Sequence, residues 1–149
     1  MWDTVRNADE LVFVCSGNII RSAFCDIYAH NLRFQKSIRS FATTHHNTEL
    51  YHKTRDYLKR VGVDDAIINQ FSPTHISEFV RSENAVYFVM TREHRQILLE
   101  NGYPEDRIFL TKEIDGIRDD VLDPYYHGKF DQTLELLKTI IDKLHRYIM

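Results

Sequence analysis

A cysteine and an arginine enclose a short loop near the N-terminus of this 149-residue sequence. Five residues separate Cys15 from Arg21, and an apolar run precedes them. A loop of that length can curl until its backbone N–H groups converge on one anion, and a guanidinium can grip two oxygens of that anion. The same groups favour a thiolate at Cys15. The spacing therefore predicts a phosphate cradle with a nucleophile beside it.

The residues inside the loop favour such a curl. Gly17 and Asn18 accept left-handed or strained dihedral angles. Arg21 would begin a helix whose positive dipole end faces the cradle, and the hydroxyl of Ser22 could donate to the sulfur of Cys15. The residues expected to hold phosphate are Ser16, Gly17, Asn18, Ile19, Ile20 and Arg21. The Cys-Arg spacing alone would be weak evidence, because a cysteine at a strand end usually packs in the core.

A second chemical group lies near the C-terminus, in the segment Asp123-Pro124-Tyr125-Tyr126. A phosphate ester needs a proton on its leaving oxygen, and the carboxyl group of Asp123 could supply it. Pro124 restricts Asp123 to an extended backbone and so holds that carboxyl group in place. Tyr125 and Tyr126 could form an aromatic slot beside it. Taken alone, the segment would be interpreted as a structural turn with two packing tyrosines.

The elements that would position these residues alternate along the chain. Four short apolar runs predict buried strands at 11–15, 38–43, 85–90 and 107–111. Helical patterns cover 50–61, 91–101 and 130–148, and another helix follows the loop. This alternation predicts an α/β fold with a parallel sheet and helices on both faces. Ligands bind beyond the carboxyl ends of such strands, which is where Cys15 lies.

Composition excludes several classes of protein. At 43% hydrophobic and 28% charged residues, the chain has an ordinary globular composition. Without repeats or linkers, we expect one domain over residues 1–149, with residues 1–9 as a short N-terminal extension. A net charge of −3 with no basic run argues against nucleic-acid binding. No apolar run approaches the roughly 18 residues of a membrane span, so no membrane partner is expected.

The two cysteines are too few for a disulfide framework. A reducing compartment is the default, so we expect a cytoplasmic location. Cys25 would lie on the helix after the loop and fill the core. The pair His45-His46 lacks a matching metal-ligand spacing, so neither a metal nor a cofactor is expected. The charged run at 92–95 is expected to be a solvated helix face.

The two segments together resemble the low-molecular-weight protein tyrosine phosphatase family. The resemblance is carried by Cys15-Ser16-Gly17-Asn18-Ile19-Ile20-Arg21-Ser22 and by Asp123-Pro124-Tyr125-Tyr126, and it spans nearly the whole chain. It implies a three-layer fold with a four-stranded parallel sheet of flavodoxin-like order. It also implies hydrolysis of phosphotyrosine through a cysteinyl-phosphate intermediate without a metal. The implied partner is a phosphotyrosine-containing protein or a small aryl phosphate, and a monomer is favoured.

The resemblance also implies roles for individual residues. By position, Cys15 is the nucleophile, Arg21 holds phosphate and Asp123 is the general acid. The residues that match loop supports are Asn18, Ser22 and Ser40. The expected substrate slot consists of Ile19, His46, Tyr125 and Tyr126.

The sequence departs from the family pattern at four positions. Ile20 stands where many members have a second cysteine, which removes a disulfide partner for the nucleophile. Ala23 stands where proline is usual, and Ala42 where glycine is. A supporting histidine expected about five residues after Gly62 corresponds to Ile67.

Three other functions stay open. An arsenate reductase of this fold would need resolving cysteines downstream, and no cysteine follows Cys25. Arginine phosphatases tend to have threonine at the position of Ile19, so the apolar residue favours tyrosine. A non-catalytic phosphotyrosine-binding module would be plausible if Cys15, Arg21 or Asp123 were replaced, and none is.

Overall fold

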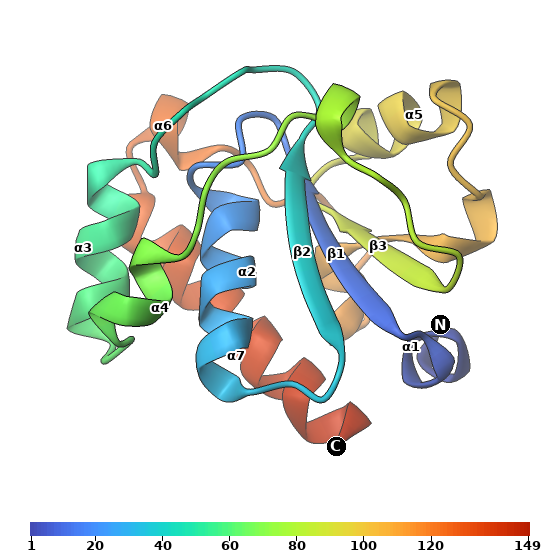
Figure 1. Ribbon diagram of the computed structural model, residues 1–149, viewed down its shortest axis with the longest axis horizontal. Helices are drawn as coiled ribbons and strands as arrows, with labels where there is room; N and C mark the ends of the chain where they lie inside the picture. The colour runs from blue at the N-terminus through green and yellow to red at the C-terminus, as the bar shows by residue number, and fades with distance from the viewer.

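Four parallel strands form the sheet of the computed structural model, which describes residues 1–149 (Figure 1). They are β1 (Glu10–Cys15), β2 (Ser37–Ala42), β3 (Ala85–Val89) and β4 (Ile108–Leu110), in the order β2-β1-β3-β4. Each strand lies within one residue of its predicted bounds, so the strand predictions and the flavodoxin-like order are confirmed. β1 is buried at every residue because strands flank it on both sides and helices cover both faces.

Seven helices connect and cover these strands. They are α1 (Trp2–Asn7), α2 (Arg21–Leu32), α3 (His52–Arg60), α4 (Asp65–Asn69), α5 (Arg92–Glu100), α6 (Pro124–His127) and α7 (Phe130–Ile148). Short 3₁₀ turns occur at Ile76–Glu78, Glu105–Arg107 and Thr111–Asp115. The helices predicted from periodicity are α3, α5 and α7, and the helix expected after the loop is α2. None of the helices has both the length and the apolar character needed to cross a lipid bilayer.

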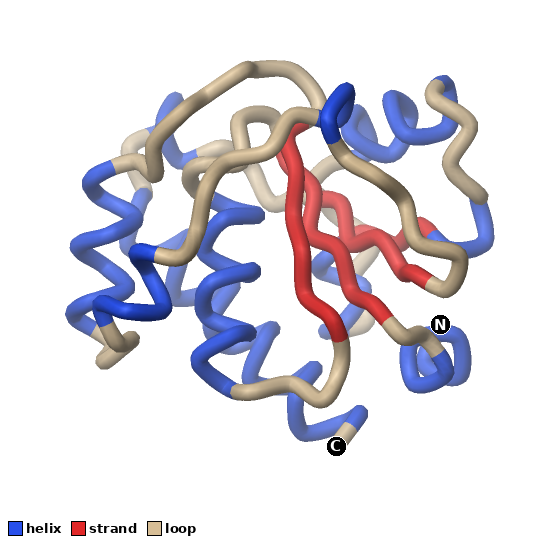
Figure 2. Tube along the Cα trace, viewed as in Figure 1, coloured by secondary structure: helices blue, strands red, loops and turns tan.

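The sheet separates two apolar clusters, which makes three layers (Figure 2). Side chains of a strand alternate between its faces. Leu11 and Phe13 of β1 therefore join the larger cluster with α2 and α7, whereas Val12 and Val14 join the smaller cluster, which α5 covers. Cys25 of α2 is fully buried in the larger cluster, as expected of a core residue.

Residues 1–9, expected only as an extension, contain a helix that packs against the other end of the chain. The ring of Trp2 in α1 lies 5.0 Å from that of Tyr147 in α7, measured between centroids. The Nε of Arg6 donates to the backbone carbonyl of Tyr147 at 3.2 Å, and Val5 is fully buried. Figure 1 shows α1 and the end of α7 on the same side of the molecule.

The carboxyl ends of the four strands lie at one edge of the sheet, because all the pairs are parallel. The loop after β1, the segment after β2 and the start of α5 meet at this edge, at the top of Figure 1. The tips of parallel strands offer a crevice that no strand side chain fills. The fold therefore brings Cys15, the last residue of β1, to this crevice.

Candidate active site

The segment from residue 15 to residue 21, here called the Cys–Arg loop, directs its carbonyl groups into the protein. The carbonyl of Ser16 accepts the N–H groups of Thr44 and His45 at 3.1 and 3.0 Å. The carbonyl of Ile19 accepts the hydroxyl of Thr54 at 2.8 Å. A trans peptide points its N–H away from its own C=O, and the chain contains no cis bond. The N–H groups that follow these carbonyls therefore turn toward the opposite side of the loop.

No backbone N–H group from Ser16 to Arg21 donates a hydrogen bond within the protein. Unpaired N–H groups of a loop that opens a helix are the usual means of binding an anion. Gly17 allows the curl, because a Cβ there would lie 2.9 Å from the Nδ2 of Asn47. That Nδ2 donates to the Gly17 carbonyl at 3.0 Å. Asn18 adopts a left-handed φ of 56°, as the sequence predicted for a strained position.

Arg21 begins α2 and is 3% exposed. Its Nη1 donates to the carbonyl of Val121 at 2.8 Å. Its Nη2 lies 3.5 Å from the Oγ of Ser16 and 3.5 Å from the Oδ2 of Asp123. The buried Nε has no hydrogen-bond acceptor in the protein. A buried guanidinium whose Nε has no acceptor, and whose nearest carboxylate is 3.5 Å away, strongly favours an anion beside it.

The sulfur of Cys15 lies 2.9 Å from the Oγ of Ser22. The amide of Asn18 donates to the same Oγ at 2.8 Å. Since the amide can only donate, the hydroxyl oxygen accepts from Asn18, and its own hydrogen is available to the sulfur. A donor aimed at sulfur stabilises the thiolate form over the thiol.

A buried network holds Asn18 in place. Its Nδ2 also donates to the Oγ of Ser40 at 2.9 Å, and its Oδ1 accepts the N–H of Thr74 at 2.9 Å. Ser40 in turn donates to the Oδ2 of Asp26 at 2.5 Å. The structure thus brings together the three residues expected to support the loop. It adds Asp26 and His30, which the sequence analysis did not identify, and the hydrogen bond that His30 donates to the Asp26 carboxylate raises the pKa of His30.

Asp123 is the N-cap of α6, which begins at Pro124. Its backbone is extended, with φ −72° and ψ 114°, as a residue before proline requires. The Oδ1 of Asp123 accepts the N–H of Tyr125 at 3.0 Å, while the Oδ2 faces Arg21. The cap therefore fixes one carboxylate oxygen and leaves the other for the site.

A cavity of about 370 Å³ opens over the loop. Its lining consists of Cys15, Ser16, Gly17, Ile19, Ile20, Arg21, His45, Asn47, Tyr51, Asp123, Tyr125 and Tyr126. Tyr51 and Tyr125 meet edge to face with centroids 6.0 Å apart, so an aromatic wall stands on one side. Asn18 is absent from the lining because it is fully buried beneath the loop. The segments around residues 15 and 123 therefore line one cavity.

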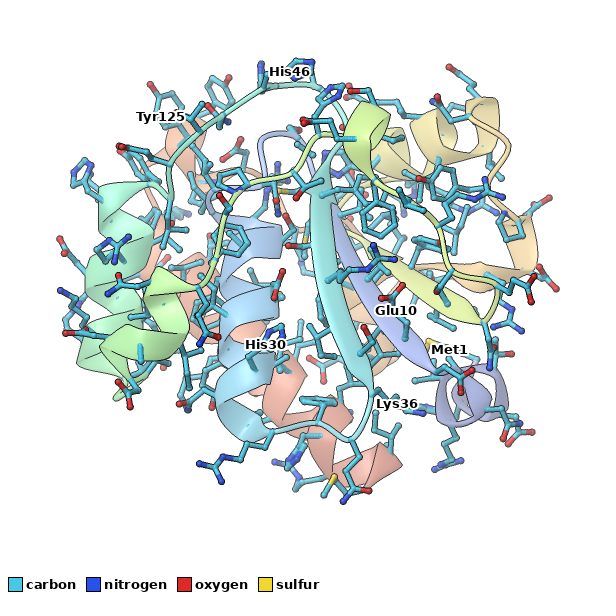
Figure 3. All side chains as sticks on the ribbon, in the orientation of Figure 1. Met1, Glu10, His30, Lys36, His46 and Tyr125 are labelled. Carbon is cyan, nitrogen blue, oxygen red and sulfur yellow. The ribbon has the colours of Figure 1, made fainter.

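His46 is the one residue of the expected substrate slot that lies outside the cavity lining. Its ring stacks on that of His75, with centroids 3.6 Å apart, and does not line the cavity. Figure 3 shows His46 at the top of the molecule and Tyr125 apart from it at the upper left. The neighbouring His45 lines the cavity in place of His46. The sequence indicated the segment correctly but could not indicate which of two adjacent side chains turns inward.

The prediction that the charged run at 92–95 faces solvent is wrong at His94, which is 3% exposed. His94 lies in the first turn of α5, and its Nε2 is 2.8 Å from the Oγ of Ser16. Burial, and then the charge of Arg21, lower the pKa of His94 to about 3. One signal in the sequence pointed to it. A histidine three residues after Thr91 occupies the helix-capping position just beyond a predicted central strand.

Comparison with known proteins places these features in a family. A model of the family described as low molecular weight phosphotyrosine protein phosphatase matches residues 10–149. The chain is 24% identical over 148 residues to the low molecular weight protein-tyrosine-phosphatase YfkJ of Bacillus subtilis, which covers 90% of this chain and 92% of that protein.

Solved structures agree on the fold. A low molecular weight protein tyrosine phosphatase from T. tengcongensis is 28% identical, with a TM-score of 0.72 over 91% of this chain and 96% of that one. The YwlE arginine phosphatase from Geobacillus stearothermophilus is 22% identical, with a TM-score of 0.76 over 92% of this chain and 90% of that one. The latter likeness concerns the fold alone.

Proposed function

The chain belongs to the low molecular weight phosphotyrosine protein phosphatase family, and we propose that it hydrolyses phosphotyrosine through a cysteinyl phosphate on Cys15. One observation carries the proposal: the N–H groups from Ser16 to Arg21 lack acceptors in a loop that also contains a buried guanidinium. A dianionic phosphoryl group would supply acceptors to both. The sulfur of Cys15 lines the same cavity.

In the first step, the thiolate of Cys15 attacks phosphorus, so that an S–P bond forms and the P–O bond to the phenol breaks. The N–H groups of the loop and Arg21 stabilise the charge on the equatorial oxygens. Asp123 gives a proton to the leaving phenolate oxygen. The position of Asp123 supports this role, because the helix cap fixes its Oδ1 and its Oδ2 faces the cavity side of Arg21.

In the second step, water attacks the phosphorus of the cysteinyl phosphate. Asp123, now a carboxylate, takes a proton from that water, the new O–P bond forms and the S–P bond breaks. The products are inorganic phosphate and the restored thiolate. The hydrogen bond between Ser22 and Cys15 favours this step, since a donor to sulfur stabilises the leaving thiolate.

A phosphotyrosine protein or a small aryl phosphate suits the cavity better than the other candidates. Ile19 contributes an apolar wall and Tyr51, Tyr125 and Tyr126 contribute aromatic ones, which together fit a flat phenyl ring. YwlE is named an arginine phosphatase. A phosphoarginine guanidinium would need acceptors where Ile19 offers only carbon. We therefore propose tyrosine over arginine as the substrate.

The proposed chemistry also favours a cytoplasmic location. Cys15 and Cys25 are both free thiols, and a cysteine nucleophile works only while it is reduced. A reducing compartment keeps such a thiol available.

A turnover assay against matched phosphopeptides tests the proposal. The same peptide is prepared with phosphotyrosine, phosphoserine or phosphoarginine, and released phosphate is measured with the purified protein and with Cys15→Ser. We expect turnover of the tyrosine peptide by the unmutated protein only. The proposal fails if no peptide is hydrolysed, or if Cys15→Ser retains the activity. Preferential hydrolysis of phosphoarginine would refute phosphotyrosine as the substrate but leave the cysteinyl-phosphate mechanism in place.

A further inference from the structure

His94 lies where two neighbouring strands end. It follows β3, whereas Ser16 follows β1, and β1 and β3 are paired in the sheet. Its Nε2 is 2.8 Å from the Oγ of Ser16, and its side chain is buried. The mechanism proposed above uses neither side chain. A buried imidazole in contact with a residue that lines the cavity raises the question of what the ring does there.

The hydrogen bonds of the ring identify its tautomer. The backbone N–H of Thr91 lies 3.1 Å from the Nδ1 of His94, and an N–H group can only donate. The Nδ1 therefore accepts. The ring is neutral near pH 7, because burial and the charge of Arg21 depress its pKa to about 3. A neutral ring with an unprotonated Nδ1 has its single hydrogen on Nε2.

This tautomer determines the direction of the Ser16 hydroxyl. The Nε2–H of His94 donates to the Oγ of Ser16, and the Nη2 of Arg21 approaches the same oxygen at 3.5 Å. Both neighbours are donors, so neither can accept the hydroxyl hydrogen. Ser16 lines the cavity, and the remaining direction for its hydrogen is toward an acceptor placed there.

We propose that His94 is a positioning residue, which orients the hydroxyl of Ser16 to donate a hydrogen bond to an oxygen of the bound phosphoryl group. The inference rests on the proposed function and adds a side-chain donor to the backbone donors of the Cys–Arg loop. It also gives a reason for the neutral ring. A protonated imidazole would present a second cation beside Arg21 and would lose the acceptor that Thr91 requires.

A purely structural role is the competing explanation, because His94 also caps α5. The N–H of His94 donates to the Oγ1 of Thr91 at 3.2 Å, which completes a reciprocal cap with the bond to Nδ1. Two variants separate the roles. In His94→Asn the amide oxygen replaces Nδ1 and keeps the cap, but no atom reaches the Nε2 position. In His94→Gln the longer side chain brings an amide nitrogen to the Nε2 position.

The experiment measures the dissociation constant of inorganic phosphate by calorimetry. The proteins compared are the unmutated chain, Ser16→Ala, His94→Asn, the double variant, His94→Gln, and the control His145→Asn, which removes a half-buried imidazole from α7. We expect Ser16→Ala and His94→Asn each to weaken binding by about 10-fold, the loss of one hydrogen bond to a charged ligand. The double variant should be no weaker than either. His94→Gln should regain most of the affinity.

Three results would overturn the inference. The two losses could multiply in the double variant, His94→Asn could lower the melting temperature without weakening phosphate, or His94→Gln could bind as poorly as His94→Asn. If His94→Asn does not fold, NMR of the ring nitrogens of His94 in the unmutated protein tests the inference instead. An Nε2–H on His94 that shifts when phosphate is added supports the inference, and a protonated Nδ1 or an unchanged signal refutes it.

The same assays distinguish failure of the inference from failure of the proposed function. Normal phosphate binding with the expected pattern of variants, but without hydrolysis of any phosphopeptide, would retain the role of His94 and refute the phosphatase. Hydrolysis of phosphotyrosine without that pattern of variants would retain the phosphatase and refute the role of His94. An unmutated protein that neither binds phosphate nor hydrolyses any phosphopeptide would refute both.

Discussion

The guanidinium of Arg21 lies 3.5 Å from the carboxylate of Asp123, the nearest atoms being Nη2 and Oδ2. One residue opens the first helix after β1, and the other caps α6 near the end of the chain. Arg21 also holds the carbonyl of Val121, two residues before Asp123. The phosphate-binding cation and the candidate acid therefore hold a fixed distance from each other, although the chain between them forms most of the sheet.

Asp123→Asn should slow the first chemical step in proportion to how badly the leaving oxygen needs a proton. Asparagine keeps the helix cap, since its oxygen can still accept the N–H of Tyr125, but it cannot act as an acid. For an ester of a phenol with a pKa of about 10, we expect a loss of about 10²–10⁴-fold. The loss should shrink for a strongly acidic nitrophenol. Single-turnover rates check this, and an equal loss for both leaving groups would make Asp123 a structural residue.

Cys15→Ser should abolish turnover, whereas Cys25→Ser should leave it nearly unchanged. Cys15 lines the cavity, while Cys25 is fully buried in α2 and burial raises its pKa well above the ordinary value for a thiol. A thiol kept neutral in the core is a poor nucleophile. Released phosphate and circular dichroism are measured for both variants. Complete loss of activity in a well-folded Cys25→Ser would contradict a single nucleophile.

Ile19→Thr should relax the preference for phosphotyrosine over phosphoarginine. Ile19 lines the cavity with carbon alone, and threonine would place a hydroxyl group there. We expect the ratio of kcat/KM for the two substrates to fall by about 10-fold, the range that a small change in an apolar pocket produces. Peptides of identical sequence provide the comparison. An unmutated protein with equal kcat/KM for both would rule out the tyrosine preference.

Asn18→Ala should destabilise the protein by about 3–5 kcal/mol, because it removes the hydrogen-bond partner of two buried hydroxyl groups and one partly buried N–H group. Those groups are the hydroxyls of Ser22 and Ser40 and the N–H of Thr74. Asn18→Gly loses the same bonds but tolerates the φ of 56°, so it should be more stable than alanine there by about 1 kcal/mol. Urea denaturation measures both, and equal stability of the variants would mean that this φ carries no strain.

The stability of the protein should fall in acid partly through His94. Its pKa drops from 6.5 when exposed to about 3 when buried. Between these values the unfolded chain binds a proton that the folded chain refuses, so the free energy of unfolding falls by up to roughly 1.4 kcal/mol per pH unit. The stability advantage of the unmutated protein over His94→Asn should therefore shrink from about pH 7 to about pH 5.

His30 provides the control for that experiment, because its pKa is raised in the folded protein, whereas that of His94 is lowered. The hydrogen bond to Asp26 raises the pKa of His30, so its stabilisation is present below pH 6.5 and disappears as the pH rises through the folded value. The stability advantage of the unmutated protein over His30→Asn should therefore grow as the pH falls. The quantity compared is the difference in free energy of unfolding between the unmutated protein and each variant. If both differences changed in the same direction with pH, the neutral state inferred for His94 would be wrong.

The sequence predicted the parts of the fold that depend on long patterns. Continuous apolar runs located all four strands, and α7 followed from its apolar stripe. The helices α1, α4 and α6 were not predicted, because helices of four to six residues are too short for periodicity and depend on tertiary contacts.

The residues of the site also fall into those that the sequence predicted and those that it did not. The segments around Cys15 and Asp123 followed from spacing and residue type. The burial of His94 and the choice of His45 over His46 did not, because side-chain direction in a loop or first helical turn depends on what packs against it. Asp26 illustrates the same limit, since its contact with Ser40 arises only when α2 lies against β2.

The contact between Arg21 and Val121 also has a consequence for the order of synthesis. The ribosome makes the nucleophile loop before it makes the carbonyl of Val121, the carboxyl group of Asp123 and the helix α7 that packs on α2. Domains complete their packing only when all the contacting segments are available. During synthesis, the nascent chain thus contains the thiol of Cys15 before it contains the carboxyl group of Asp123. The protein therefore gains its complete site only after α7 has been made.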